Sequence, residues 1–155
     1  IAYNYGAGHK DRVIKTIKHS VAYGVGIMFV GLLAMHIFPA QLMRMFDAEE
    51  SLIAIGAPAL ETISLSFVFA GFCIVAGSVF QALGNGVYSM IVSVARQMCV
   101  LLPVAKLLSL SGEVTLIWWA FPIAELASVL LTSYFLVRIY RKVICHIGEP
   151  VVQDA

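Results

Sequence analysis

Residues 62–95, TISLSFVFAGFCIVAGSVFQALGNGVYSMIVSVA, decide the fold because no formally charged side chain interrupts them. A helix needs roughly 20 apolar residues to cross the hydrocarbon core of a bilayer, so this stretch holds one crossing and the start of another. The sequence Gly84-Asn85-Gly86 inside it is typical of a turn, because glycine tolerates positive φ and often ends a helix. The stretch therefore predicts two transmembrane helices joined by a short turn.

Uncharged stretches also lie on both sides of this one. One runs from Lys18 to Arg44, counting histidine as neutral, and another runs from Glu113 to Arg138, with Glu125 as its only formal charge. We expect an all-α polytopic membrane protein in which residues 1–155 form a single membrane module. Its four transmembrane helices are predicted at about 19–38, 51–83, 87–110 and 114–140.

Composition supports a lipid environment and gives no sign of an enzyme. Hydrophobic residues make up 61% of the chain and charged residues 12%, against roughly 25% charged residues in ordinary soluble domains. No basic run with interleaved aromatic residues indicates nucleic acid, and the four histidines have no metal-ligand spacing. Cys73, Cys99 and Cys145 show neither metal-type pairing nor a disulfide pattern, so we expect reduced thiols. No metal, cofactor or catalytic residue is predicted.

The distribution of cations predicts the orientation in the membrane. Basic residues cluster before the first predicted helix and after the last, whereas the joints 39–61 and 111–113 are mainly acidic or uncharged. Cytoplasmic segments of membrane proteins carry the excess of Lys and Arg, so both ends are predicted to be cytoplasmic. We expect a multi-pass protein of a bacterial or archaeal plasma membrane. The cations in question are Lys10, Arg12, Lys15, Lys18, Arg138, Arg141 and Lys142.

Several predicted helices contain features that should bend them. The helix at 51–83 is longer than a bilayer requires, so its first turns, near Gly56 and Pro58, are expected to project or bend. Pro103 and Pro122 lie inside the third and fourth predicted helices. Proline is tolerated there when neighbouring groups satisfy the freed carbonyls, and interrupted helices are common in transporters.

Two charged residues are expected deep in the membrane, where ionisable groups are expensive and often functional. Arg96 follows Ser89 and Ser93 on one helical stripe, and Glu125 belongs to another polar stripe on the next helix. An Arg96–Glu125 pair would lower the cost of burying each charge. Two interpretations remain: an ion pair that fixes helix packing, or a proton or substrate site. Lys106 lies nearer the outer end, where we expect its side chain to reach the interface.

Small residues recur every seven positions in the helix predicted at 51–83, at Ala57, Ser64, Gly71 and Ser78. Small residues on one side of a membrane helix let a neighbouring backbone approach closely. The stripe indicates either close packing or a surface that lines a substrate path.

Short motifs in a consistent order give the chain a family resemblance. In order and spacing they resemble the C-terminal part of a multidrug and toxic compound extrusion (MATE) transporter, over nearly all of residues 1–142. The motifs are Tyr3-Asn4-Tyr5-Gly6-Ala7-Gly8, Phe46-Asp47-Ala48, Gly56-Ala57-Pro58-Ala59-Leu60, Ile63-Ser64-Leu65-Ser66, Phe80-Gln81-Ala82-Leu83-Gly84-Asn85, Arg96-Gln97 with Pro103, and Phe121-Pro122-Ile123-Ala124-Glu125.

The resemblance implies a fold and a function. Such transporters have two six-helix lobes around a cleft and exchange H⁺ or Na⁺ for an organic cation by alternating access. This chain, which starts at Ile1 without a methionine, would be a fragment that supplies the last four of twelve helices. Its partners would be the lipid bilayer, the preceding helices with the N-terminal lobe, and organic cation or drug substrates. The coupling ion would bind mainly outside this fragment.

The resemblance also makes the helix at 51–83 the one that faces the cleft. The implied substrate-contact residues are Phe67, Gly71, Ile74 and Gln81. Some family members have an acidic cation-site residue in this helix, but residues 66–78 contain none. Three alternatives stay open: a flippase for lipid-linked oligosaccharides, a complete four-helix drug transporter acting as a dimer, and a membrane scaffold without a water-accessible cleft.

Overall fold

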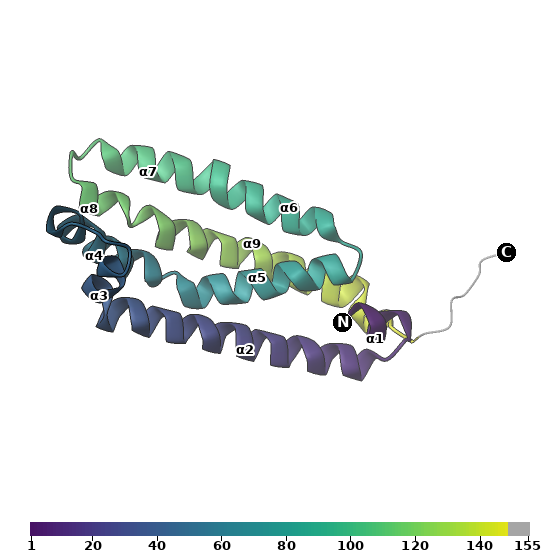
Figure 1. The fold of residues 1–155 in the computed structure, drawn as a ribbon. Coiled ribbons are helices and arrows are strands. Elements are labelled where there is room, and N and C mark those ends of the chain that lie inside the picture. Colours follow the sequence, from purple (N-terminus) through teal and green to yellow (C-terminus); the bar gives the residue numbers. More distant parts are fainter. Residues whose placement is uncertain (149–155) are drawn as a thin grey trace.

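The computed structural model describes residues 1–148, which form helices joined by short turns (Figure 1). No strand occurs within these residues. The helices are α1 (Ala2–Gly6), α2 (Lys10–Ile37), α3 (Pro39–Arg44), α4 (Glu50–Ser64), α5 (Phe67–Ala82), α6 (Gly86–Val94), the π-helix η1 (Ala95–Leu101), α7 (Leu102–Ser109), α8 (Val114–Ile117), α9 (Ala120–Lys142) and the 3₁₀-helix η2 (Ile144–His146).

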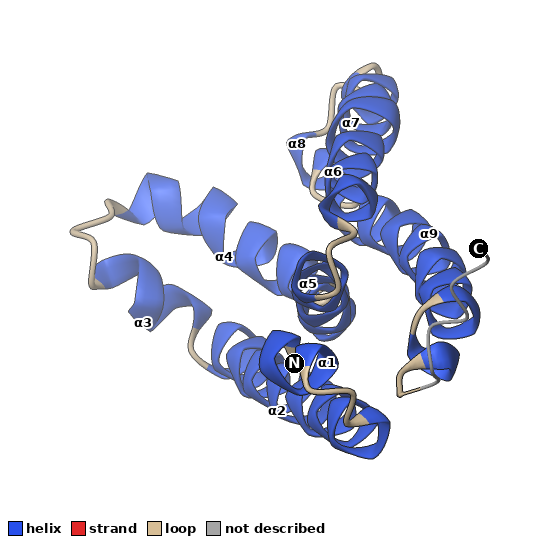
Figure 2. Ribbon diagram, turned by 90° about the vertical axis from the view of Figure 1, so that its right-hand side faces the viewer, coloured by secondary structure: helices blue, strands red, loops and turns tan. Residues whose placement is uncertain are grey.

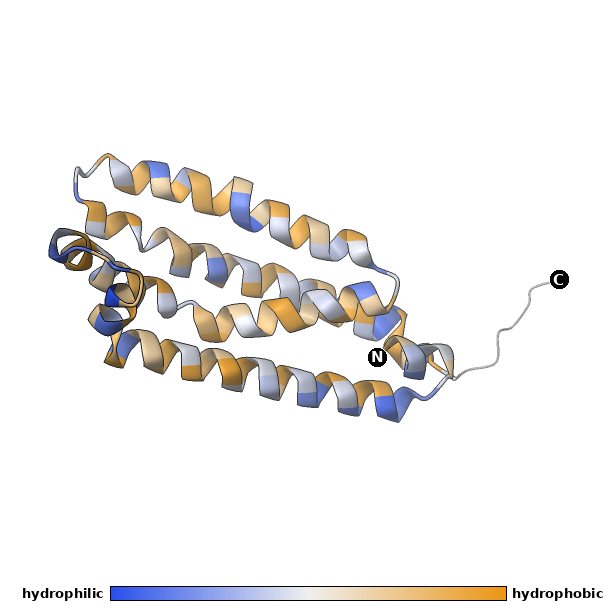
Figure 3. Cartoon of the chain, viewed as in Figure 1, coloured by the Kyte–Doolittle hydropathy of each residue, from blue (hydrophilic) through white to orange (hydrophobic). Residues whose placement is uncertain are grey.

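Long apolar rods make up the bundle, which confirms the predicted all-α polytopic membrane fold. In the described part of the chain, three continuous helical stretches are long and apolar enough to cross a membrane: Lys10–Ile37, Gly86–Ser109 and Val114–His146. The pair α4 and α5 makes a fourth if it is counted as one bent span. Hydrophobic residues run along these rods, and hydrophilic ones gather at the start of α2 (Figure 3).

The termini of the described chain lie at the same end of the bundle. Figure 1 places the N-terminus, the turn between α5 and α6, and the end of α9 together, whereas α3, α4 and the turn between α7 and α8 lie at the opposite end. Helix α5 packs against α2 on one side and against α9 on another, and α9 also contacts α6 and η1. Both termini lie at the same end because the chain runs the length of the bundle an even number of times when α4 and α5 are counted as one bent span.

The first long helix begins earlier than expected, at Lys10 instead of about residue 19. Its basic first turns are helical because they are anchored to the rest of the bundle. Val13 is completely buried in the core, and Lys10 Nζ donates a hydrogen bond of 2.7 Å to the carbonyl of Cys145 near the end of the chain. Asp11 in the first turn also interacts favourably with the helix dipole.

The helix predicted at 51–83 is divided, but not at the expected position near Gly56 and Pro58. Pro58 remains inside α4, and the break falls at residues 65–66, where α4 and α5 diverge by 54°. Two serines beside the break satisfy carbonyls there: Ser64 Oγ donates to Glu61 O at 3.0 Å and Ser66 Oγ donates to Ile63 O at 2.6 Å. Such side-chain bonds to the preceding turn often bend helices. As a result α3 and α4 extend sideways from the bundle (Figure 2).

The other two predicted spans are continuous stretches whose helical geometry changes along their length. In the stretch expected at 114–140, a turn at Trp118 and Trp119 joins α8 to α9 without a large bend. The helix expected at 87–110 is continuous but becomes a π-helix immediately before Pro103. A proline ring clashes with the carbonyl four residues earlier, here that of Cys99, and the wider π turn gives this carbonyl more room.

A Schellman motif ends α5, as the glycines of the predicted turn suggested. Gly84 has φ of +76°, its N–H donates to Gln81 O at 3.0 Å, and the N–H of Asn85 donates to Phe80 O at 2.7 Å. These are the two bonds of the motif. The turn reverses the chain so that α6 returns beside α5, which places Ser89 opposite Gln81.

The core of the bundle lies at the end that holds this turn. Phe80 and Val79 are completely buried there, and Phe135 stacks on Tyr88 with ring centroids 4.5 Å apart. Further along, α2 and α5 approach closely at Gly24 and Gly71, where a Cβ added to Gly71 would lie 3.0 Å from Gly24 O. Close approach of this kind is what small residues provide in membrane helices.

Candidate functional site

An ion pair links η1 to α9 in the middle of the bundle. Arg96 Nη1 donates a hydrogen bond of 3.1 Å to Glu125 Oε2, so the structure contains the contact expected from the sequence. The two side chains differ in environment: 5% of the Glu125 side chain is exposed, against 41% of the Arg96 side chain. The carboxylate is therefore held inside the bundle by a cation that reaches it from a partly open position.

The buried face of α9 carries polar groups that other described residues leave without partners. Glu125, Ser128 and Thr132 are all buried and follow one another at helical spacing on one face. Glu125 Oε1 and Ser128 Oγ form no hydrogen bond within the described structure. Buried polar atoms are nearly always hydrogen-bonded to protein or water, so these two atoms mark a position for water or a small bound species.

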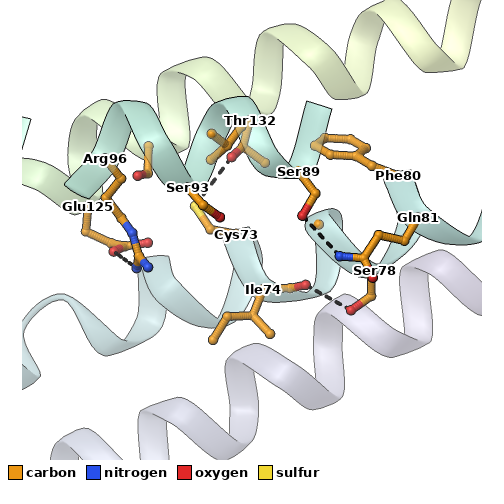
Figure 4. A pocket seen from close by; sticks show the side chains of 13 residues that line it. Cys73, Ile74, Ser78, Phe80, Gln81, Ser89, Ser93, Arg96, Glu125 and Thr132 are labelled. Atoms are coloured by element: carbon orange, nitrogen blue, oxygen red, sulfur yellow. Dashed lines mark hydrogen bonds and ion pairs between the residues drawn. The ribbon is translucent and has the colours of Figure 1, made fainter. Parts of the chain in front are cut away.

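A polar cavity of about 220 Å³ lies in front of this face. Its walls come from α5, from α6 with η1, and from α9 (Figure 4). We call it the inner cavity. The residues that line it are Cys73, Ile74, Gly77, Ser78, Phe80, Gln81, Ser89, Val92, Ser93, Arg96, Glu125, Ser128 and Thr132.

Hydrogen bonds connect the walls of the inner cavity. Gln81 Nε2 on α5 donates to Ser89 Oγ on α6 at 3.2 Å, and Thr132 Oγ1 on α9 donates to Cys73 Sγ on α5 at 3.7 Å. Figure 4 shows both contacts. The serines at 89 and 93 and Arg96 share one stripe of the third rod, so the polar stripes predicted on two consecutive helices do face each other across this space.

The residues proposed from the family resemblance to contact substrate do not lie on one surface. Ile74 and Gln81 line the inner cavity. Phe67 packs beside Gly31 of α2 and lines a second cavity of about 240 Å³. Gly71 is buried against Gly24 and lines neither cavity, because the crossing of α2 and α5 occupies its side of the helix.

Sequence reasoning missed Cys73 as a cavity residue. Its position relative to Gly77 and Gln81, at intervals of four residues, was the available signal, since these positions share a helix face. Among residues 1–148, no three His, Cys, Asp or Glu side chains gather in a way that would hold a metal ion. The cavity instead offers one carboxylate, one guanidinium, hydroxyl groups and an amide.

A bundle of apolar helices with a partly open polar cavity on one side is consistent with a membrane-embedded transport protein. The model of the MatE family matches residues 1–107, and the chain belongs to this family. Membership indicates a multidrug or cation efflux transporter at the level of the family, and such proteins are transporters and not enzymes. No curated protein and no solved structure matches the chain significantly.

The family match covers only part of the candidate site. Arg96 and the cavity walls from α5 and α6 lie within residues 1–107, whereas Glu125, Ser128 and Thr132 lie beyond them. The structure, and not the family match, therefore joins Arg96 to its acidic partner.

Proposed function

We propose that this chain forms part of a secondary active antiporter that exports organic cations, including drugs, by alternating access while H⁺ or Na⁺ enters the cell. The protein would lie in the plasma membrane with both ends on the cytoplasmic side. Glu125 in the inner cavity is the observation that carries the proposal. A carboxylate in a membrane-spanning bundle is costly, and such groups mark ion and substrate pathways.

The volume of the inner cavity indicates what kind of species could bind in it. Sites for drug-sized ligands have volumes of about 300–1,000 Å³, and the inner cavity has about 220 Å³. This space suits water or a small ion better than a drug. The organic cation would instead bind in a larger cleft formed with the rest of the transporter, along the exposed side of α5 where Ile74 is 60% exposed.

The charge of the inner cavity gives no support for a lipid-linked phosphate as substrate. Its single guanidinium, Arg96, is already paired with Glu125 among the residues that line the cavity. A flippase for lipid-linked oligosaccharides would need surplus positive charge to bind a diphosphate. The lining offers no such surplus.

An efflux assay tests the proposed function. The complete gene product and residues 1–155 alone would each be expressed in a bacterial strain that lacks its own efflux pumps, with membrane insertion confirmed for both. We expect the complete product to lower ethidium accumulation, and a protonophore or sodium ionophore to abolish the effect. The isolated chain should not export ethidium, because one part of one lobe cannot form the alternating cleft.

Two results would contradict the proposal. Unchanged ethidium accumulation in cells that express the complete product well would exclude drug export as its function. Gradient-dependent export by residues 1–155 alone would instead favour a small transporter that works as a dimer.

A further inference from the structure

Two cavities meet at the Arg96–Glu125 ion pair. The second cavity, which we call the outer cavity, lies beside the break between α4 and α5. Of all the residues that line the inner and outer cavities, only Arg96 and Glu125 belong to both linings. The outer cavity is lined by Met28, Ser66, Phe67, Ala70, Arg96, Gln97, Leu101, Phe121, Ala124 and Glu125.

The cavities follow one another along the axis of the bundle. On α5 the inner cavity is lined from residue 73 to residue 81 and the outer cavity from 66 to 70, and α9 shows the matching division on either side of Glu125. At 1.5 Å per helical residue, Ser66 and Gln81 are about 22 Å apart along the axis. The two cavities thus extend over most of a hydrocarbon core of about 30 Å.

We propose that the Arg96–Glu125 ion pair is the closed partition of a route for protons and water along the partly open groove between α5, η1 and α9. The route begins at the end with the α5–α6 turn, passes through the inner cavity, and leaves through the outer cavity. The inference goes beyond the proposed function, because the route needs no organic cation.

The chemistry of the partition depends on which groups face Glu125. The titratable side chains that line the two cavities are Glu125 itself on α9, Arg96 on η1 and Cys73 on α5. Arg96 Nη1 donates a hydrogen bond of 3.1 Å to the Glu125 carboxylate and so keeps the pair closed. Opening requires a proton on the carboxylate or a displaced guanidinium, and the partly exposed Arg96 side chain has room to turn.

The proposed proton-transfer step at the ion pair conserves atoms and charge. A hydronium ion in one cavity gives its proton to a Glu125 oxygen, so an O–H bond forms on the carboxyl and a water molecule remains. The neutral carboxyl no longer attracts Arg96 by its charge. The same O–H bond then breaks toward water in the opposite cavity, and the carboxylate recovers its partner. Glu125 Oε1, which has no partner in the described structure, is the oxygen available for this step.

Proton leak through reconstituted protein tests the partition. The complete gene product would be placed in liposomes containing a pH-sensitive dye, and proton entry would be driven by a potassium diffusion potential without any drug. The double variant Arg96→Ala/Glu125→Ala removes the partition and should raise proton entry at least about tenfold, which corresponds to a barrier lower by about 1.4 kcal/mol. The swapped pair Arg96→Glu/Glu125→Arg should keep the leak low.

A second ion pair in the same chain provides the control. Arg44 and Glu50 pair at 3.0 Å, but both side chains are largely exposed and neither lines the inner or the outer cavity. The variant Arg44→Ala/Glu50→Ala removes the same two side-chain types and should leave the leak unchanged. An equal leak in a correctly folded Arg96→Ala/Glu125→Ala variant and in this control would overturn the partition.

Cysteine labelling keeps the proposal testable even if the double variant does not fold. In a cysteine-free background with the ion pair intact, Ser89→Cys in the inner cavity should react with a small impermeant thiol reagent only from the side of the α5–α6 turn. Ala70→Cys in the outer cavity should react only from the opposite side. Reaction of either cysteine from both sides would show that the ion pair does not separate the cavities. Because no drug is used, these results are independent of the efflux assay.

Discussion

Removing one partner of the Arg96–Glu125 ion pair should destabilise the protein more than removing both. The variants are Arg96→Met, Glu125→Gln and the double variant, all made in the complete gene product. With an effective dielectric constant of 20, two unit charges 3.1 Å apart attract by roughly 5 kcal/mol. Partial exposure of the Arg96 side chain reduces the attraction that is realised.

The unequal burial of the two side chains predicts unequal losses. Arg96→Met leaves a charged Glu125 whose side chain is 5% exposed, and breaking a buried pair in this way costs about 3–5 kcal/mol. We expect the lower end, about 3 kcal/mol, because water in the inner cavity would solvate the carboxylate in part. Glu125→Gln leaves an Arg96 that can turn toward its open side, so about 1–2 kcal/mol is expected.

The measurement is the free energy of unfolding from detergent denaturation of each purified variant. The double variant should lose less stability than either single variant, and so less than the sum of the single losses by at least about 1 kcal/mol, since neither charge is left without its partner. Losses that add to within about 0.5 kcal/mol would show that the two side chains are not coupled. Such additivity would refute both the contact and the partition built on it.

Two further predictions concern packing and orientation. Gly24→Leu should lower the free energy of unfolding by about 1–3 kcal/mol, because a Cβ at that position would lie 2.7 Å from a methyl group of Val75. The control Gly26→Leu on the same helix should be tolerated, because no atom lies within 4 Å of its added Cβ. Equal losses of the two variants in detergent denaturation would contradict the packing argument. Single cysteines at Lys15, Glu49 and Glu113 should react with an impermeant thiol reagent from inside, outside and outside respectively, and labelling of position 49 only from the cytoplasm would overturn this orientation.

Hydropathy and helix-ending residues predicted the membrane-spanning helices and the turn between α5 and α6. Long stretches with few or no charges located the three continuous spans and the bent pair of α4 and α5, and Gly84 marked a turn in which its φ is positive. The break at residues 65–66 was misplaced because proline is only one cause of a bend, and here serine hydroxyls bonded to nearby carbonyls are found at the break. The helical start at Lys10 was missed because its support comes from residues near the end of the chain.

The candidate site was predictable where helical spacing alone decides which residues share a face. Charge and periodicity placed Arg96 and Glu125 on facing stripes, and the structure joins them. Spacing left two interpretations of the stripe that contains Gly71, close packing or a substrate path, and Gly71 packs at the crossing of α2 and α5 instead of on the cleft side that the family resemblance implied. Nor could a linear pattern reveal two cavities in series, since this depends on how three helices pack together.

The π-helix at Ala95–Leu101 has a consequence for insertions and deletions in this part of the chain. A π turn holds one residue more than the α-helical turn it replaces. Deleting one residue from it would restore an ordinary α-helix, and α7 would keep roughly its present facing because the π turn already absorbs the extra residue. Arg96 and the stripe before it would keep their positions, and Lys106 would also keep its facing although its number would fall by one. A homologue shorter by one residue here should therefore have its polar positions after Pro103 displaced by one.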